Sequence, residues 1–261
     1  MGPRETKTAA GAVAAGLILV GVTVDRRRGT RPLGAISGVT AAVGYVVATF
    51  FPRTRLFGAP ARVVATTGLF ALTFDDGPDP RHTPAISRIL AERGHQATFF
   101  ALGRAVRAHP EPTRAVLEYG HEIACHGDDH RLLGFASPSR LRRQIGRAES
   151  AILGATGEPP VPLFRAPHGV RSPWLTHVVA RRGYRVCAWD GSVFDTAEPG
   201  VETIVARVER QLRPGVVILL HDGDGSCRGA SRSQTVDALP AILAAAERRG
   251  LRSVRLSAIV A

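Results

Sequence analysis

The stretch LFALTFDDGPD, residues 69–79, decides the fold class of this chain. Its first part, Leu69–Phe74, is an apolar β-type run, and two adjacent carboxylates, Asp75 and Asp76, follow the end of that run. A buried strand that stops at ionisable residues is typical of α/β proteins, whose reactive groups lie at the carboxyl ends of parallel strands.

Outward from this stretch, short apolar runs alternate with longer helical patterns to the end of the chain. The candidate strands are Leu69–Phe74, Ala97–Leu102, Glu122–Cys125, Val161–Arg165, Arg185–Trp189, Val216–Leu220 and Ser253–Leu256. The candidate helices are Pro84–Arg93, Pro110–Tyr119, Ser139–Ala155, Pro173–Arg182, Val201–Leu212 and Gln234–Arg249. Strands that alternate with helices predict a parallel sheet with right-handed crossovers, either open or closed into an incomplete barrel.

Ionisable residues follow five of these predicted strands. They are Asp75 and Asp76 after the first, His126 and His130 after the third, Arg165 and His168 after the fourth, Asp190 and Asp195 after the fifth, and His221 and Asp222 after the sixth. Because the carboxyl ends of parallel strands meet at one edge, we expect these side chains to converge there.

Two histidines and an acidic pair in this group have the donor chemistry of a catalytic metal site. His126 and His130 are four residues apart, which lets both imidazoles bind one ion from a helical turn or a tight loop. Two imidazoles and one carboxylate suit a divalent cation, most commonly Zn²⁺. A lone histidine pair is more often a surface or hydrogen-bonded pair, but its coincidence with Asp75 and Asp76 on a strand tip favours the metal site.

These segments resemble the motifs of the polysaccharide deacetylases, carbohydrate esterase family 4 (the NodB homology domain). Thr73–Pro78 reads TFDDGP, the first motif of that family without a change, and His126-x-x-x-His130 resembles the second. Arg165–Gly169 resembles the third motif and Leu220–Asp222 the fifth. The resemblance extends over about Leu69–Leu256.

The resemblance implies a distorted (β/α) barrel of about seven strands and a role for each matched residue. Asp76, His126 and His130 would hold a divalent metal, most commonly Zn²⁺, with Co²⁺ or another divalent ion as the alternative. Asp75 would be the general base, Arg165 would orient it and keep it ionised, and His221 would be the general acid. Pro167, His168 and Leu220 would contact the substrate: the backbone N–H of His168 at the oxyanion, and the side chain of Leu220 at the acyl methyl group.

Three positions in two of the motifs depart from the family pattern. Where the fourth motif has two Asp followed by Trp, this chain has Ser192, Asp195 and Thr196. We expect Asp195 to hydrogen-bond His221 and raise its pKa, whereas the glycan-contacting aromatic side chain is absent at Thr196. Gly127 replaces the hydroxyl residue that usually follows the first metal histidine.

The first sixty residues have the pattern of a membrane anchor. Residues 8–24 and 33–51 contain no charged residue, and the basic connection DRRRGTR lies between them. A bilayer span needs about 20 apolar residues, so the two segments predict a transmembrane hairpin that anchors the chain to the lipid bilayer. The chain then divides into an anchor, 1–60, and a catalytic domain, 61–261, that we expect at the cell membrane on its extracytoplasmic side. A signal peptide in the first segment is the alternative.

The overall composition restricts the possible partners. The chain carries 34 Lys+Arg against 22 Asp+Glu, a formal net charge of +12, which could serve nucleic acid, anionic lipid or an acidic cell-wall polymer. The arginines are spread without an RNA-recognition signature, so we expect no nucleic-acid role, and no obligate protein partner is inferred. Cys125 and Cys187 sit in apolar runs and are predicted to be core residues.

Three functions therefore follow from the sequence as hypotheses. The leading one is metal-dependent hydrolysis of N-acetyl groups on N-acetylglucosamine-type glycans, either a cell-wall polysaccharide or a chito-oligosaccharide. The second is deacylation or deformylation of a lipid-linked sugar at the bilayer. The third is a non-catalytic glycan-binding membrane protein, which the separate base and acid, Asp75 and His221, argue against.

Overall fold

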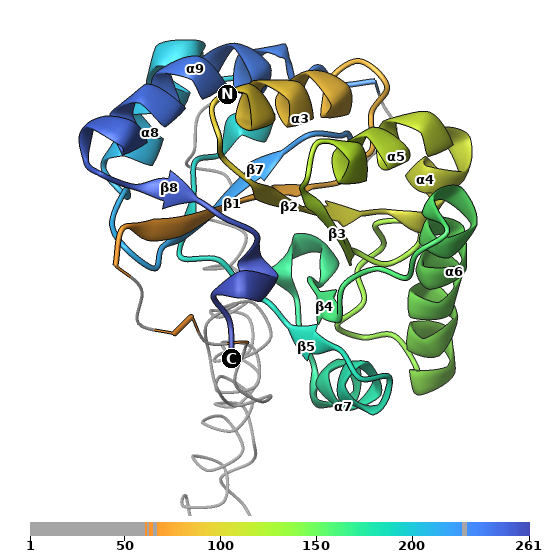
Figure 1. Cartoon of the computed structure of the whole chain (residues 1–261). Helices are drawn as coiled ribbons and strands as arrows, with labels where there is room; N and C mark the ends of the chain where they lie inside the picture. Colours follow the sequence, from red (N-terminus) through yellow and green to blue (C-terminus); the bar gives the residue numbers. More distant parts are fainter. Residues whose placement is uncertain (1–60, 62, 65–66, 226–228) are drawn as a thin grey trace, which may run out of the picture.

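A curled parallel sheet forms the centre of the molecule, with helices around its outer face (Figure 1). The computed structural model describes residues 61, 63–64, 67–225 and 229–261. The strands are β1 Leu69–Asp75, β2 Ala97–Ala101, β3 Glu122–Cys125, β4 Leu163–Phe164, β5 Arg185–Val186, β6 Gly191–Ser192, β7 Val217–His221 and β8 Arg252–Ser253. Seven of them follow the order β5-β4-β3-β2-β1-β7-β6, and β8 pairs with the start of β1.

The helices cover the convex face of this sheet (Figure 1). They are α3 Thr83–Glu92, α4 Gly103–Ala108, α5 Pro110–Glu118, α6 Pro138–Thr156, α7 Pro173–Arg181, α8 Val201–Glu209 and α9 Ser233–Arg248. Three short 3₁₀ helices are η1 Pro167–Gly169, η2 Asp195–Ala197 and η3 Leu256–Ala258. α6 is the longest, and the Ser137 side chain caps its start by accepting a hydrogen bond from the backbone N–H of Arg140.

Both faces of the sheet are buried, which explains the near-continuous apolar runs in its strands. Successive side chains of a strand point to opposite faces. In β1, Phe70, Leu72 and Phe74 belong to the core shared with the helices, whereas Ala71 belongs to a second core. The second core also contains Phe100, Ala124, Leu163, Cys187 and Val217. The two described cysteines, Cys125 and Cys187, are buried and unpaired, as predicted.

The predicted α/β class is confirmed as a curled parallel half-barrel, in which four elements differ from the prediction. The two-residue strand β6 and the helix α4 were not expected. The last strand, β8, ends at Ser253, and the predicted residues up to Leu256 instead lead into η3. β5 ends at Val186, so Trp189 lies outside the strands, although it still packs against the second core.

The predicted membrane hairpin, residues 8–24 and 33–51, lies outside the described residues, and so does the boundary between anchor and catalytic domain at residue 60. Among the helices of the described part, none combines the length and the apolar character that a bilayer span needs. Anchoring and location therefore stay predictions.

Candidate active site

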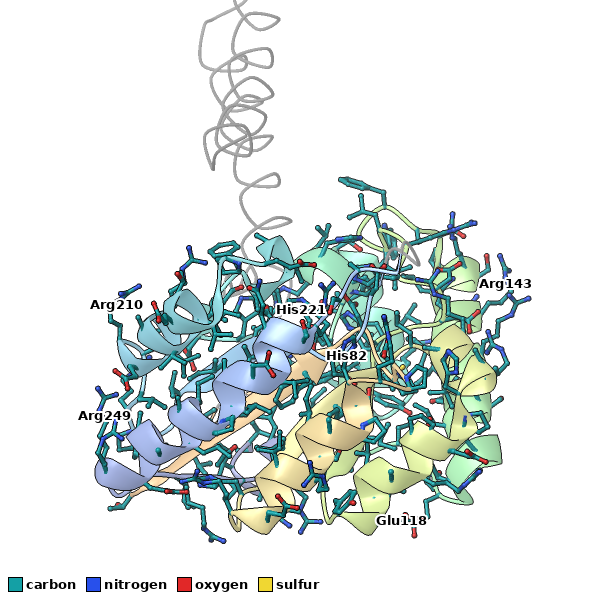
Figure 2. All side chains as sticks on the ribbon, turned by 90° about the horizontal axis from the view of Figure 1, so that it is seen from above. His82, Glu118, Arg143, Arg210, His221 and Arg249 are labelled. Atoms are coloured by element: carbon teal, nitrogen blue, oxygen red, sulfur yellow. The ribbon has the colours of Figure 1, made fainter. Side chains whose placement is uncertain are left out.

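The predicted reactive residues gather at the edge where β1, β3 and β7 end. β1 pairs with β7 so that Asp75 lies opposite His221, which is labelled in Figure 2. The backbone N–H of His126, just after β3, donates to the carbonyl of Ala101 at the end of β2. The parallel register therefore brings Asp75 and His221 together, although they are 146 positions apart in the sequence.

Asp76, His126 and His130 form the one cluster in the described part of the chain with the donor set of a metal site. One ligand atom from each lies within 4.8 Å of the others. Asp76 Oδ1 is 3.0 Å from Nε2 of His130 and 3.4 Å from Nε2 of His126. This oxygen is buried and has no hydrogen-bond partner, as expected for a carboxylate oxygen that coordinates a cation when one is bound. The three side chains thus fit a divalent metal ion.

A hydrogen bond to the backbone fixes the orientation of the His126 ring relative to the candidate metal site. Its Nδ1 lies 2.9 Å from the carbonyl oxygen of Arg165, which can only accept, so Nδ1 carries the hydrogen. Nε2, the atom that faces Asp76, is then the position that a metal ion would take. Burial raises the pKa of Asp76 most, yet the imidazoles of His126 and His130 outweigh it and hold the pKa well below its usual range. Asp76 is therefore a buried anion.

Unusual backbone conformations position two of these ligands. Asp76 has φ 78° and His130 has φ 58°, both in the left-handed region. A non-glycine residue in this region costs on the order of 1–3 kcal/mol and persists only where the surroundings fix it. Gly127, the departure between the two histidines, has φ 85°, so a residue without Cβ suits its conformation.

Asp75 is held by a fully buried arginine. Arg165 has 0% exposure, and its Nη1 donates to Asp75 Oδ1 at 2.7 Å and to Thr73 Oγ1 at 2.8 Å. The guanidinium carbon lies 4.0 Å from the centre of the Phe100 ring and forms a cation–π contact with it. The other oxygen, Asp75 Oδ2, is 3.8 Å from Nε2 of His126 and faces the cluster. The predicted Arg165–Asp75 contact is present.

On the other side of the cluster, Asp195 holds His221. Asp195 Oδ1 lies 2.8 Å from Nδ1 of His221, and its Oδ2 accepts the backbone N–H of His221 at 2.8 Å. Thr235 Oγ1 also donates to Oδ2. Burial, the largest influence, lowers the pKa of His221, but the hydrogen bond and charge of Asp195 outweigh it and raise the pKa to about 9. The predicted Asp195–His221 pair is therefore present.

The three residues expected at the substrate lie in different surroundings. Pro167 is buried in η1, and the exposed His168 follows it with φ 59°. The centre of the His168 ring lies 4.3 Å from the centre of the His130 ring, with the two planes tilted by 49°, and its Nε2 lies 3.2 Å from the His130 carbonyl oxygen. Leu220 has 0% exposure and packs in the core shared with the helices. His168 thus borders the cluster, whereas the contact of Leu220 with an acyl group stays a prediction.

The remaining acidic residues of the strand ends serve other contacts. Asp190 Oδ2 accepts the backbone N–H of Val217. The buried Asp128 forms ion pairs with Arg107 and Arg147, and Asp129 accepts the backbone N–H of Arg131. Ser192 lies in β6 and Thr196 is exposed in η2.

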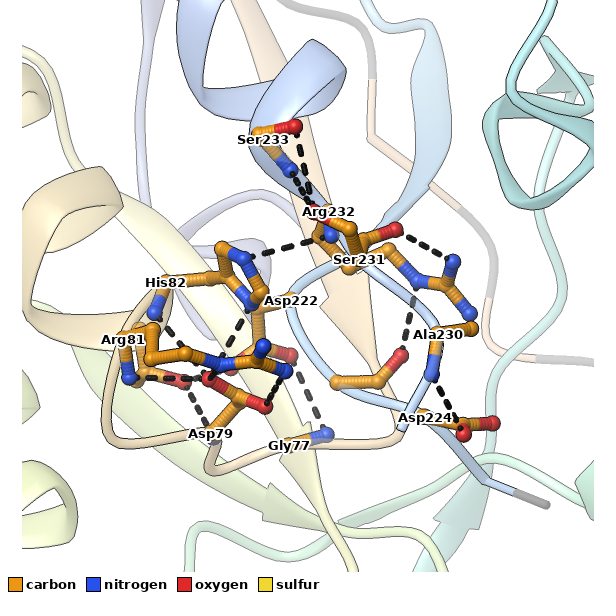
Figure 3. Close-up of polar contacts among 12 residues, drawn as sticks. Gly77, Asp79, Arg81, His82, Asp222, Asp224, Ala230, Ser231, Arg232 and Ser233 are labelled. Carbon is orange, nitrogen blue, oxygen red and sulfur yellow. Dashed lines mark hydrogen bonds and ion pairs between the residues drawn. The ribbon is translucent and has the colours of Figure 1, made fainter. Parts of the chain in front are cut away.

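The sequence did not predict that Asp222 contacts the segment after Asp76. Asp222 is 1% exposed, and its Oδ1 accepts the N–H of Gly77 in the β1–α3 loop at 3.2 Å (Figure 3). Its Oδ2 accepts the hydroxyl of Thr83, the first residue of α3, at 2.5 Å. Burial raises the pKa of Asp222 to about 7. The only signal in the sequence is its place directly after His221.

The loop after β7 continues this support around the cluster. A Cβ on Gly223 would lie 2.4 Å from the backbone oxygen of Asp76, and one on Gly225 would lie 2.4 Å from Nδ1 of His130. Arg232 Nε donates to the Gly223 carbonyl, and the Arg232 N–H donates to Nε2 of His82 (Figure 3). Two glycines thus allow this loop to pack directly against two of the candidate ligands.

Comparison with known proteins identifies the family. The polysaccharide deacetylase family matches residues 63–187. A chitooligosaccharide deacetylase of Bradyrhizobium sp. (strain ANU 289) is 37% identical over 193 residues, which cover 72% of this chain and 88% of that protein. The chain belongs to the polysaccharide deacetylase family.

Other members of the polysaccharide deacetylase family support the same assignment. A peptidoglycan-N-acetylglucosamine deacetylase of Bacillus cereus is 36% identical over 194 residues, which cover 74% of this chain and 88% of that protein. The solved structure of a family 4 carbohydrate esterase from Streptomyces lividans, in complex with acetate, superposes with a TM-score of 0.65 at 32% identity. That match covers 72% of this chain and 93% of the esterase.

Proposed function

We propose that this chain is a metal-dependent hydrolase that removes N-acetyl groups from N-acetylglucosamine-type glycans. The proposal rests on five side chains that lie at one edge of the sheet. Three are candidate metal ligands, and the other two are Asp75, which is hydrogen-bonded to Arg165, and His221, which is hydrogen-bonded to Asp195. Hydrolysis of an amide needs a base for the attacking water and an acid for the departing nitrogen, and these two pairs supply both.

Asp76, His126 and His130 are the residues that would hold the metal. When bound there, a divalent cation would polarise the substrate carbonyl and lower the pKa of water. We propose Zn²⁺ because two imidazoles and one carboxylate leave positions open for water and substrate, with Co²⁺ or another divalent ion as the alternative. The His126 Nδ1–H bond to Arg165 fixes the ring in the required orientation.

Asp75 is the proposed general base. Its Oδ1 accepts a hydrogen bond from Arg165, while Oδ2 faces the cluster and is available to take a proton from water. Arg165 thereby also fixes the direction in which Asp75 presents Oδ2.

His221 is the proposed general acid. With a pKa of about 9 it is protonated at neutral pH, and Asp195 occupies Nδ1, so Nε2–H is the group left to protonate the leaving amine. The backbone N–H of His168 is the proposed oxyanion donor, and Pro167 and Leu220 are proposed to shape the place of the acyl methyl group. A single donor of this kind is typically worth about 10²–10³ in rate.

The substrate class is inferred from the relatives. The proteins similar to this chain include a chitooligosaccharide deacetylase and a peptidoglycan-N-acetylglucosamine deacetylase, so an N-acetylated glycan is the proposed partner. The test is acetate release from N-acetylglucosamine oligomers by the full chain, measured beside metal analysis of the same sample. Bound oligomer without acetate release at any pH would instead support the glycan-binding hypothesis.

A second candidate is deacylation or deformylation of a lipid-linked sugar by a membrane-anchored protein whose catalytic domain faces outward. Leu132, Phe135, Trp174 and Phe194 are exposed large apolar side chains in segments that follow the carboxyl ends of strands. Such side chains suit contact with a lipid-linked acceptor. Activity on lipid-linked acyl-sugars but not on soluble oligomers would replace the leading proposal with this one.

A further inference from the structure

A groove of about 970 Å³ lies beside helix α6, outside the catalytic cluster. Small residues of α6 line it: Gly146, Ser150, Ala151, Gly154 and Ala155. Its charged side chains are Arg107, Arg143, Arg147, Arg182 and Glu149. Small side chains leave space above the helix, and four arginines surround that space.

The arginines are only partly neutralised. Glu149 pairs with Arg182, and the buried Asp128 pairs with Arg107 and Arg147. Two carboxylates against four guanidinium groups leave a formal excess of two positive charges. The Arg143 side chain is exposed and forms no hydrogen bond or ion pair with any residue in the part of the chain that the structure describes.

The basic end of this groove adjoins the loop that carries two of the candidate metal ligands. Asp128, the shared partner of Arg107 and Arg147, lies between His126 and His130 in the sequence. Arg143 and Arg147 belong to the first half of α6, the half nearer the β3–α6 connection. Figure 2 shows Arg143 on the flank of the molecule and His221 nearer its middle.

From this arrangement we infer that the groove binds the anionic groups of an acidic N-acetylated glycan while a neighbouring sugar occupies the metal site. The inference rests on the proposed deacetylase function and narrows its substrate class. A guanidinium binds carboxylate or phosphate through two parallel hydrogen bonds, and Arg143 has all of its donors available. A concave groove with small residues along it fits a sugar chain better than a flat bilayer surface.

The test compares two oligosaccharides of equal length. One is a hyaluronan hexasaccharide, in which N-acetylglucosamine alternates with glucuronate, and the other is chitohexaose, which is neutral. We expect a higher kcat/KM for acetate release from the acidic oligosaccharide at low salt and a smaller preference at high salt. Arg143→Gln should reduce this preference about fivefold, as expected for one exposed charge contact, and Arg143→Glu should reduce it further.

The matched control is Arg142→Gln, which removes the same charge from the neighbouring exposed position of α6 that does not line the groove. Its preference should equal that of the wild type. Equal preference for the two oligosaccharides in the wild type, or an equal loss in Arg142→Gln and Arg143→Gln, would overturn the inference.

Binding measurements separate this inference from the proposed function. If neither oligosaccharide releases acetate, the proposed function fails, and the groove is judged by binding of fluorescent polygalacturonate and of polyphosphate, with neutral dextran as the blank. Salt-sensitive binding that Arg143→Glu weakens would support an anion groove, and the better of the two probes would distinguish carboxylate from phosphate recognition. Binding to phosphatidylglycerol vesicles alone, without binding of either polymer, would assign the arginines to a membrane surface instead.

Discussion

At the residue scale, the two adjacent buried carboxylates Asp75 and Asp76 differ in their contacts. Asp75 receives the Arg165 guanidinium, whereas Asp76 has an oxygen without a hydrogen-bond partner beside two imidazoles. Arg165 thus occupies Oδ1 of Asp75 and leaves its Oδ2 facing the cluster, whereas Oδ1 of Asp76 lies between the two imidazoles, where a cation would bind.

This difference predicts opposite results for two substitutions. Asp75→Asn should keep the metal and lower the turnover number by about 10²–10⁴, because it removes the base and leaves the ligands. His126→Ala should instead lose metal affinity, because it removes one of the three ligands. Metal content and kcat measured on both purified variants check the assignment, and metal loss in Asp75→Asn with metal retention in His126→Ala would show that the roles are reversed.

The Asp195–His221 pair predicts the alkaline limb of the pH profile. An acid must be protonated to donate, and the pKa of His221 is raised to about 9, so kcat/KM should hold through neutral pH and fall as the pH rises through about 9. In Asp195→Asn the raising interaction is lost, and the limb should move toward neutral pH. A pH profile of acetate release for both proteins measures the shift, and an unmoved alkaline limb in Asp195→Asn would exclude His221 as its origin.

The convergence of Asp75, Asp76, His126, His130 and His221 was predictable from sequence because each lies within a few residues of a strand end. The support by Asp222 was not, because its contact with Gly77 spans 145 residues and depends on how two loops pack. Likewise, Gly223 and Gly225 have no side chain by which a sequence pattern could indicate contact with Asp76 and His130.

At the element scale, Gly223 and Gly225 after β7 pack against the backbone of Asp76 and the ring of His130, two of the candidate metal ligands. Gly225→Ala would place a Cβ 2.4 Å from Nδ1 of His130, so the ring must move. We expect metal affinity to fall about 10–100-fold, as for other groups that orient metal ligands. Metal titration of the apo-protein measures the change.

Gly154→Ala is the matched control for this substitution. Gly154 lies inside α6, and a Cβ there meets nothing within 4 Å. Metal affinity should be unchanged, and the free energy of unfolding should rise by about 0.5–1 kcal/mol because alanine favours the helix. Unchanged metal affinity in Gly225→Ala would show that the loop does not position His130.

The long elements and the four-residue strand β3 were predicted within a few residues, whereas α4 and β6 were not predicted. α6 has a helical periodicity and a cap, and β1 is an apolar run that ends at an acidic pair, so local sequence encodes both. β6 consists of Gly191–Ser192 and forms only by pairing with β7. A two-residue strand has no periodicity, so its existence depends on the neighbouring strand.

At the scale of the whole molecule, the candidate cation site joins strands that are not neighbours. Asp76 follows β1 and His126 follows β3, and β2 lies between these strands in the sheet. A bound cation would therefore link the ends of two strands that are not neighbours, at the edge of the half-barrel where the strained backbones of Asp76 and His130 lie.

This arrangement predicts that metal removal lowers the thermal stability of the folded protein. A ligand present at one hundred times its Kd stabilises the native state by about 2.7 kcal/mol, which for a domain of this size corresponds to a decrease of about 5–10 °C in Tm after chelation. Thermal unfolding with and without EDTA measures the effect. Asp76→Asn, which lacks the anionic ligand, should melt at nearly the same temperature in both conditions, because it has little bound cation to lose. An equal EDTA-induced decrease in the wild type and in Asp76→Asn would place the stabilising cation elsewhere and would remove the support for this cluster as the metal site.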